Sequence, residues 1–148
     1  MLTEALPIYS GGLGNVAGDQ LKVASDLEVP LIAVGLLFQQ GYFRQEINAK
    51  GEQQAFFPFN NPSELAIIPV RTYDGGWLRL KIARPHPTLW LRAWQAKIGC
   101  VTLYLLDTND PANDPVVRLI GNELSAAAPN CGFGKRSLLW VFHTLHST

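Results

Sequence analysis

The chain has 148 residues, 47% of them hydrophobic, which is enough to fill the core of one domain. Its 12 basic and 12 acidic residues cancel, so charge gives no reason to expect a nucleic acid or an anionic membrane as a partner. The two cysteines, Cys100 and Cys131, form no metal-binding spacing and no disulfide framework. No signal peptide is visible, and we therefore expect a reducing, cytoplasmic location.

The first predicted element is a glycine-rich turn followed by a helix. Residues from Leu6 read as an extended entry, the turn covers Ser10 to Gly14, and the helix runs from about Leu13 toward Leu27. Its apolar positions follow three-four spacing: Leu13, Val16, Ala17, Leu21, Ala24 and Leu27. Glycines let backbone amides approach a ligand closely, and the positive end of a helix suits an anion. The glycine spacing fits neither the dinucleotide-binding nor the Walker pattern, so the turn predicts only a general anion site.

The next element is a strand, and it sets the fold class. Val29 to Leu37 is a continuous run of β-branched residues and leucines, which is typical of a strand buried on both faces of a parallel sheet. The run is too short to cross a bilayer. Together with the preceding turn and helix, it predicts an α/β fold.

The middle of the chain is predicted to be rich in β-structure. Alternating apolar and polar residues, punctuated by glycine and proline, indicate short strands and turns. Trp77, Trp90 and Trp94 fall on alternating strand positions, and we expect them in the core. The predicted elements are a loop with at most a hairpin at 39–64, a half-buried hairpin of Leu65–Thr72 and Trp77–Ala83, and strands Leu89–Ala96 and Val101–Leu106 joined through Gly99.

An acidic segment follows the last predicted strand. Asp107, Asp110 and Asp114 lie in the sequence Asp-Thr-Asn-Asp-Pro-Ala-Asn-Asp-Pro, which could suggest a cation-binding loop. The segment lacks the glycine and the terminal glutamate of a calcium loop. We therefore interpret these residues as turn formers and predict no metal site.

The residue order of the glycine-rich turn is more specific for a protein family than its general suitability for binding an anion. Residues 6–46 contain Leu-Pro-Ile-Tyr-Ser-Gly-Gly-Leu-Gly, then Ala-Gly-Asp-Gln-Leu-Lys-Val-Ala-Ser-Asp-Leu, and later Gly-Tyr-Phe-Arg-Gln. These segments closely resemble the N-terminal part of bacterial α-glucan (glycogen) phosphorylases, and Val-Thr-Leu-Tyr-Leu-Leu-Asp-Thr-Asn-Asp-Pro-Ala-Asn-Asp at 101–114 adds a second match. The resemblance covers about residues 4–124. It departs from the family at Asn15, where an aliphatic residue is usual, and at Gln20, where histidine is usual.

The resemblance implies a fold, an activity and a site. The fold would be a partial Rossmann-like N-terminal domain of a two-domain GT-B glycosyltransferase, with a β-rich insertion. Such enzymes transfer a terminal α-1,4-linked glucosyl unit of a glucan to inorganic phosphate, which releases glucose 1-phosphate. The resemblance implies that the amides of Gly11, Gly12 and Leu13 line the phosphate and glucosyl site. The alternative is a tight turn that leads into a helix and binds no ligand.

The cofactor implied by the resemblance is pyridoxal phosphate, carried on a lysine of the C-terminal domain. The lysines of this chain match no cofactor-lysine motif and are interpreted as surface charges: Lys22, Lys50, Lys81, Lys97 and Lys135. We therefore expect no catalytic residue in this chain. As a fragment, it should be inactive by itself.

The last residues do not continue the resemblance. The family has Tyr-Gly-Gly and then a helix containing Arg-Leu-Arg-Gln-Glu where this chain continues from Ser125. For one permitted choice of codons, restoring a single base at codon 125 yields Tyr-Gly-Gly-Gly-Pro-Glu-Leu-Arg-Leu-Arg-Gln-Glu. We therefore expect two regions: 1–124, part of the phosphorylase N-terminal domain, and 125–148, an out-of-frame tail.

Two other functions compete with a phosphorylase fragment. A starch or glycogen synthase-type glycosyltransferase has a related Gly-Gly-Leu loop, but it places lysine ahead of the glycines, where this chain has Tyr9 and Ser10. The other alternative is a non-enzymatic fragment, either a truncated carbohydrate-binding module or a product that fails to fold.

Overall fold

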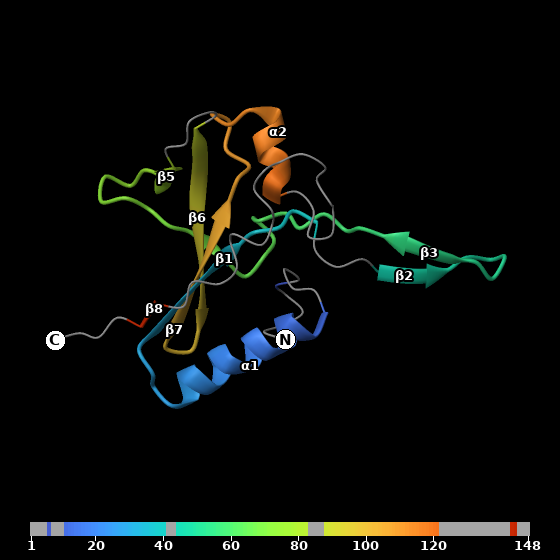
Figure 1. Cartoon of the computed structure of the whole chain (residues 1–148), viewed down its shortest axis with the longest axis horizontal. Coiled ribbons are helices and arrows are strands. Elements are labelled where there is room, and N and C mark those ends of the chain that lie inside the picture. The colour runs from blue at the N-terminus through green and yellow to red at the C-terminus, as the bar shows by residue number, and fades with distance from the viewer. Residues whose placement is uncertain (1–5, 7–10, 41–43, 83–87, 122–142, 145–148) are drawn as a thin grey trace.

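A mixed sheet with one long helix against it forms the body of the protein in the computed structural model (Figure 1). The structure describes residues 6, 11–40, 44–82, 88–121 and 143–144. Two helices and a 3-10 turn accompany the strands among these residues: α1 (Gly11–Asp26), α2 (Pro115–Arg118) and η1 (Leu119–Gly121). The described strands are β1 (Leu31–Leu36), β2 (Arg44–Ile47), β3 (Gln53–Phe56), β4 (Ile68–Pro69), β5 (Arg79–Ile82), β6 (Leu89–Ile98), β7 (Val101–Asp107) and β8 (His143–Thr144). The predicted α/β class is confirmed.

The strand order of the larger sheet is β4-β6-β7-β1-β8, and β5 also pairs with β6. β1 and β7 are parallel, with Ile32 opposite Thr102 and Leu36 opposite Leu106. β6 and β7 form an antiparallel hairpin that turns at Gly99, where φ is +58°. The predicted strands at 29–37, 89–96 and 101–106 are therefore confirmed, and the first of them lies in a parallel pair as expected.

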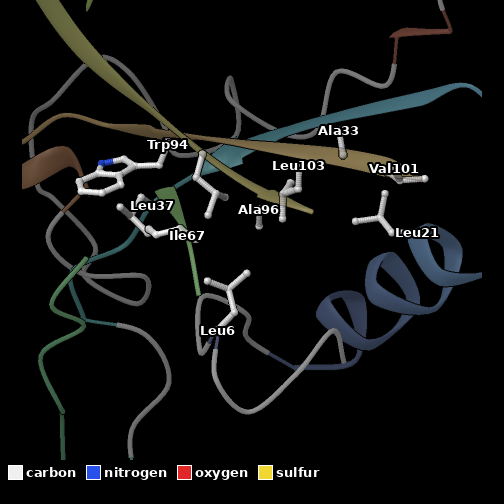
Figure 2. Packing of buried hydrophobic residues seen from close by; sticks show 10 residues of the cluster. Leu6, Leu21, Ala33, Leu37, Ile67, Trp94, Ala96, Val101 and Leu103 are labelled. Atoms are coloured by element: carbon white, nitrogen blue, oxygen red, sulfur yellow. The ribbon is translucent and has the colours of Figure 1, made fainter. Parts of the chain in front are cut away.

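The main core lies between α1 and one face of the sheet. Val101, Leu103 and Leu105 alternate along β7 and are fully buried there, because a strand points every second side chain to the same face. Figure 2 shows Leu21 reaching from α1 toward Val101. A smaller cluster on the other face joins Leu89 and Leu91 of β6 to Val117 of α2. Apart from Ala33, β1 is only half-buried, so its predicted burial on both faces is wrong for the described chain.

α1 confirms the predicted helix but begins two residues earlier, at Gly11. The predicted apolar stripe is only partly correct, because Val16 and Leu27 are exposed. The side of α1 that meets the sheet carries mainly small residues. Gly18 is buried and Ala17 and Ala24 are half-buried there, and Leu21 is the larger buried residue among them. The helix consequently lies close to the sheet.

The predicted hairpin of residues 65–83 is closed only at its turn, where Arg71 and Trp77 form a bridge. β4 and β5 each pair with β6 instead of with each other, because β6 has ten residues and offers both of them a partner along one edge. The predicted burial of one face of β5 is wrong, since all four of its residues are exposed. Of the three tryptophans expected in the core, Trp94 is buried and the other two are half-buried.

The predicted loop at 39–64 contains the hairpin that the sequence allowed. β2 and β3 pair antiparallel and form a separate two-stranded sheet beside the larger one (Figure 1). The connecting turn is held by Asn48, whose side-chain oxygen accepts hydrogen bonds from the amides of Lys50 and Glu52.

Candidate functional site

The three residues singled out from the sequence, Gly11, Gly12 and Leu13, form the first turn of α1. The first four amides of an α-helix have no acceptor within the helix, and the helix dipole makes this end positive. The first turn carries no acidic side chain that would offset this positive end. Gly12 is exposed, and a Cβ built on it would meet nothing within 4 Å. The backbone is therefore accessible to a ligand at this position.

The direction of α1 is fixed by a contact at its other end. The hydroxyl of Ser25, in the last turn, accepts a hydrogen bond from the amide of Cys100 at 3.1 Å. Cys100 directly precedes β7, so α1 runs back along the sheet against the direction of β7. The first turn of α1 therefore points toward the end of the sheet where β1 and β7 finish (Figure 1). Open α/β sheets bind their ligands outside this carboxyl end.

The segments that leave β1 and β7 are joined by hydrogen bonds. Asn60, which is buried, donates from Nδ2 to the carbonyl of Phe38 at 3.2 Å and from its amide to the carbonyl of Gln39 at 2.6 Å. Gly121 accepts from the amide of Gln39 at 2.9 Å and donates to the hydroxyl of Thr108 at 3.0 Å. The carboxyl end of the parallel pair is thus a connected framework.

The acidic segment after β7 consists of three successive turns. Asp107, Asp110 and Asp114 each accept, through Oδ1, a hydrogen bond from the amide two residues ahead, at 2.8, 2.9 and 3.0 Å. This is the local bonding for which aspartate is favoured in turns. The predicted turn role of these residues is confirmed. Among the described residues, no group of three or more His, Cys, Asp or Glu side chains could hold a metal ion.

Asp110 also carries an ion pair that sequence reasoning missed. Arg79 of β5 binds it with two hydrogen bonds, Nε to Oδ2 at 2.9 Å and Nη2 to Oδ1 at 2.6 Å. Arg92 of β6 lies 3.5 Å from the same carboxylate and stacks on Trp77. Burial opposes ionisation of Asp110. The amide of Ala112 and the two guanidinium groups outweigh that burial, so the pKa of Asp110 lies below its ordinary value.

The described lysines do not fit a cofactor-bearing role. A lysine that carries pyridoxal phosphate needs a desolvated pocket that lowers its pKa. Lys22, Lys50, Lys81 and Lys97 are all exposed, while Lys135 lies outside the described residues. None of these four described lysines is therefore suited to carry the cofactor. In the described part of the chain, no helix has the length and apolarity needed to cross a membrane.

Comparisons with known proteins find several relatives that are named as phosphorylases. The chain is 48% identical over 119 residues to the maltodextrin phosphorylase of Thermococcus litoralis, which covers 80% of this chain. It is 43% identical over 124 residues to the glycogen phosphorylase of Mycobacterium tuberculosis and 38% identical over 123 residues to that of Aquifex aeolicus, each covering 83% of this chain. The chain spans 14% of the length of the first two relatives and 18% of the third. No protein-family model matches it.

Proposed function

This chain corresponds to a segment of the α-glucan phosphorylases, and from that premise we propose that it supplies their phosphate- and glucosyl-binding turn. The intact enzyme would transfer a terminal α-1,4-linked glucosyl unit of a glucan to inorganic phosphate and release glucose 1-phosphate. The observation that carries the proposal is the sequence identity to proteins named as phosphorylases. The same relatives favour a phosphorylase over the synthase-type alternative.

In this proposal, the amides of Gly11, Gly12 and Leu13 bind the phosphate. Phosphate carries negative charge and accepts several hydrogen bonds, and the first turn of a helix offers donors and a positive field at one place. The open surface at Gly12 and the absence of an acidic residue from the first turn support this role. The pyridoxal phosphate and its lysine would come from another part of the intact enzyme.

The proposal also assigns the described elements to domains of the intact enzyme. We assign α1, β1 and β7 to a Rossmann-like domain of a two-domain GT-B fold, and residues 39–98 to its β-rich insertion. The parallel pairing of β1 with β7 and the antiparallel direction of α1 support this assignment. We also place the enzyme in the cytoplasm, with neither nucleic acid nor membrane as its partner, in keeping with the balanced charge.

We assign residues 1–124 to the phosphorylase domain and 125–148 to an out-of-frame tail. The matched lengths of 119 to 124 residues support this division. Of the tail, only His143 and Thr144 are described, and they pair with Ile32 and Leu31. Resequencing the gene across codon 125 and beyond should find either a tyrosine codon in place of Ser125 or a phosphorylase-like continuation in the shifted reading frame. Finding neither would contradict the frameshift.

A domain exchange tests the proposed function. Residues 1–124 would replace the matching segment of the maltodextrin phosphorylase of T. litoralis, and phosphorolysis of maltodextrin would be followed by the release of glucose 1-phosphate. We expect the exchanged enzyme to be active, because the segment carries its own core and its own first turn of α1. The 148-residue chain assayed alone should release none. A correctly folded but inactive exchanged enzyme would contradict the proposal, and activity of the chain alone would contradict the fragment assignment.

A further inference from the structure

The described side chains of α1 that face the sheet are mostly small. Leu21 is large and fully buried, whereas its neighbours Gly18, Ala17 and Ala24 are small. Small side chains allow close approach but resist sliding and pivoting weakly, because they interlock little with the facing surface. The chain connection at residues 27–30 attaches one end of the helix to β1. Leu6, in the segment ahead of the helix, also lies in the core. A contact in the last turn of the helix would further limit rotation about the connection.

The structure provides such a contact at the β6–β7 turn. Ser25 accepts the amide of Cys100 through its hydroxyl at 3.1 Å, and the thiol of Cys100 donates to the carbonyl of Ser25 at 3.4 Å. Gly99 makes the approach possible, because a Cβ built there would lie 1.9 Å from the Ser25 hydroxyl. Its φ of +58° is also the left-handed conformation that glycine adopts most readily. We call the set of Ser25, Gly99 and Cys100 the latch.

We propose that the latch is a positioning element that holds α1 in a fixed direction and thereby places the amides of Gly11 to Leu13. This inference rests on the proposed function for its consequence, but the positioning itself is a property of the fold. Thirteen residues separate Ser25 from Gly12, so at 1.5 Å per residue a tilt of about 5° moves the far end by almost 2 Å. A misplacement of about 1 Å is enough to weaken a catalytic or binding geometry strongly.

The direct test measures the direction of α1 relative to the sheet in the 148-residue chain. Amide residual dipolar couplings report the orientation of each N–H bond in one common frame. In the unaltered chain, we expect the couplings of α1 and of β6, β7 and β1 to fit one alignment tensor. In Ser25→Ala, the couplings of α1 should be smaller than those calculated from the alignment tensor of the sheet. The couplings of the sheet strands should stay unchanged. Ser25→Thr keeps a hydroxyl and should restore the single fit.

Two further variants make the test decisive. Lys97→Met removes another hydrogen bond of the same hairpin, from Nζ to the Thr102 hydroxyl at 2.6 Å, without touching α1, and should leave the single fit intact. Cys100→Ala removes only the thiol bond and should give a smaller loss, which decides the matter if Ser25→Ala does not fold. Couplings of α1 that still fit the sheet tensor in the folded latch variants would overturn the inference.

A titration with inorganic phosphate separates the latch from the proposed function. We expect phosphate to shift the amide resonances of Gly11 to Leu13 in the unaltered chain and to shift them less in Ser25→Ala. Loss of the single fit in Ser25→Ala, with no phosphate-dependent shift even in the unaltered chain, would uphold the latch and count against the phosphate site. A single fit in every variant, with unchanged phosphate shifts, would overturn the latch and leave the phosphate site supported.

Discussion

Asp110→Ala is expected to lower the free energy of unfolding by about 3 kcal/mol at neutral pH, as measured by urea denaturation. The carboxylate is fully buried and joins two strands to the turn after β7. Its removal leaves the Arg79 guanidinium without its acceptor and the Arg92 guanidinium without its nearby counter-charge. The effect stays below that of a fully buried pair because the side chain of Arg79 remains 41% exposed and water can hydrate it.

The pH dependence follows from the lowered pKa of Asp110. A carboxylate with a lower pKa in the folded state stabilises the fold above its unfolded pKa of about 3.9. That stabilisation is lost as the pH falls through the folded pKa, because the unfolded chain takes up the proton first. The stability difference between the unaltered chain and Asp110→Ala should therefore be full at neutral pH and shrink at acidic pH.

Asp114→Ala is the matched control for Asp110→Ala. Asp114 makes the same kind of turn bond to an amide two residues ahead, but it is exposed, and no described ion pair involves it. Its loss should cost about 1 kcal/mol, as for a helix cap. Equal effects of the two substitutions would show that the arginine pairs of Asp110 contribute nothing measurable.

Local patterns predicted the elements whose signals lie within a single segment. The three-four spacing of residues 13–27 marked α1, and the apolar run at 29–37 marked β1. Gly99 between two alternating stretches marked the β6–β7 hairpin, which is a contact between neighbours in the sequence. Such signals are strong because each residue needs only its neighbours to define its conformation.

The contacts that join distant segments could not be predicted in the same way. The sequence suggests that β4 and β5 pair with each other. In the structure, each of them pairs with the long strand β6. The sequence indicates only that Asp110 forms a turn. No residue near it predicts the ion pair with Arg79, which lies 31 residues earlier. The alternation of Arg79 and Lys81 with Leu80 and Ile82 was the available signal, because it places two cations on one face of β5.

The candidate site was predicted in part. The resemblance singled out Gly11 to Leu13, and the structure adds that they begin a helix directed toward the carboxyl end of the parallel strands. Asn60 donates hydrogen bonds to the segment after β1. Nothing in the sequence predicted this role, because its partners Phe38 and Gln39 lie more than twenty residues earlier. The role of the glycine amides stays a prediction.

Gly12→Asp is expected to reduce phosphorolysis by about a hundredfold in kcat/KM, which corresponds to about 2.7 kcal/mol of lost transition-state stabilisation. The substitution puts a negative charge where the proposal puts the phosphate. It should not disturb the fold, because the added Cβ meets nothing within 4 Å and an acidic residue suits the first turn of a helix. Gln20→Asp adds the same charge to an exposed position two turns along α1 and should leave kcat/KM nearly unchanged.

The most direct measurement is the rate of glucose 1-phosphate release by the exchanged enzyme that carries residues 1–124, compared among the unaltered segment, Gly12→Asp and Gln20→Asp. We expect near-equal rates for the first and third and a loss of about two orders of magnitude for the second. Undiminished phosphorolysis by the Gly12→Asp enzyme would contradict the claim that the first turn of α1 binds phosphate.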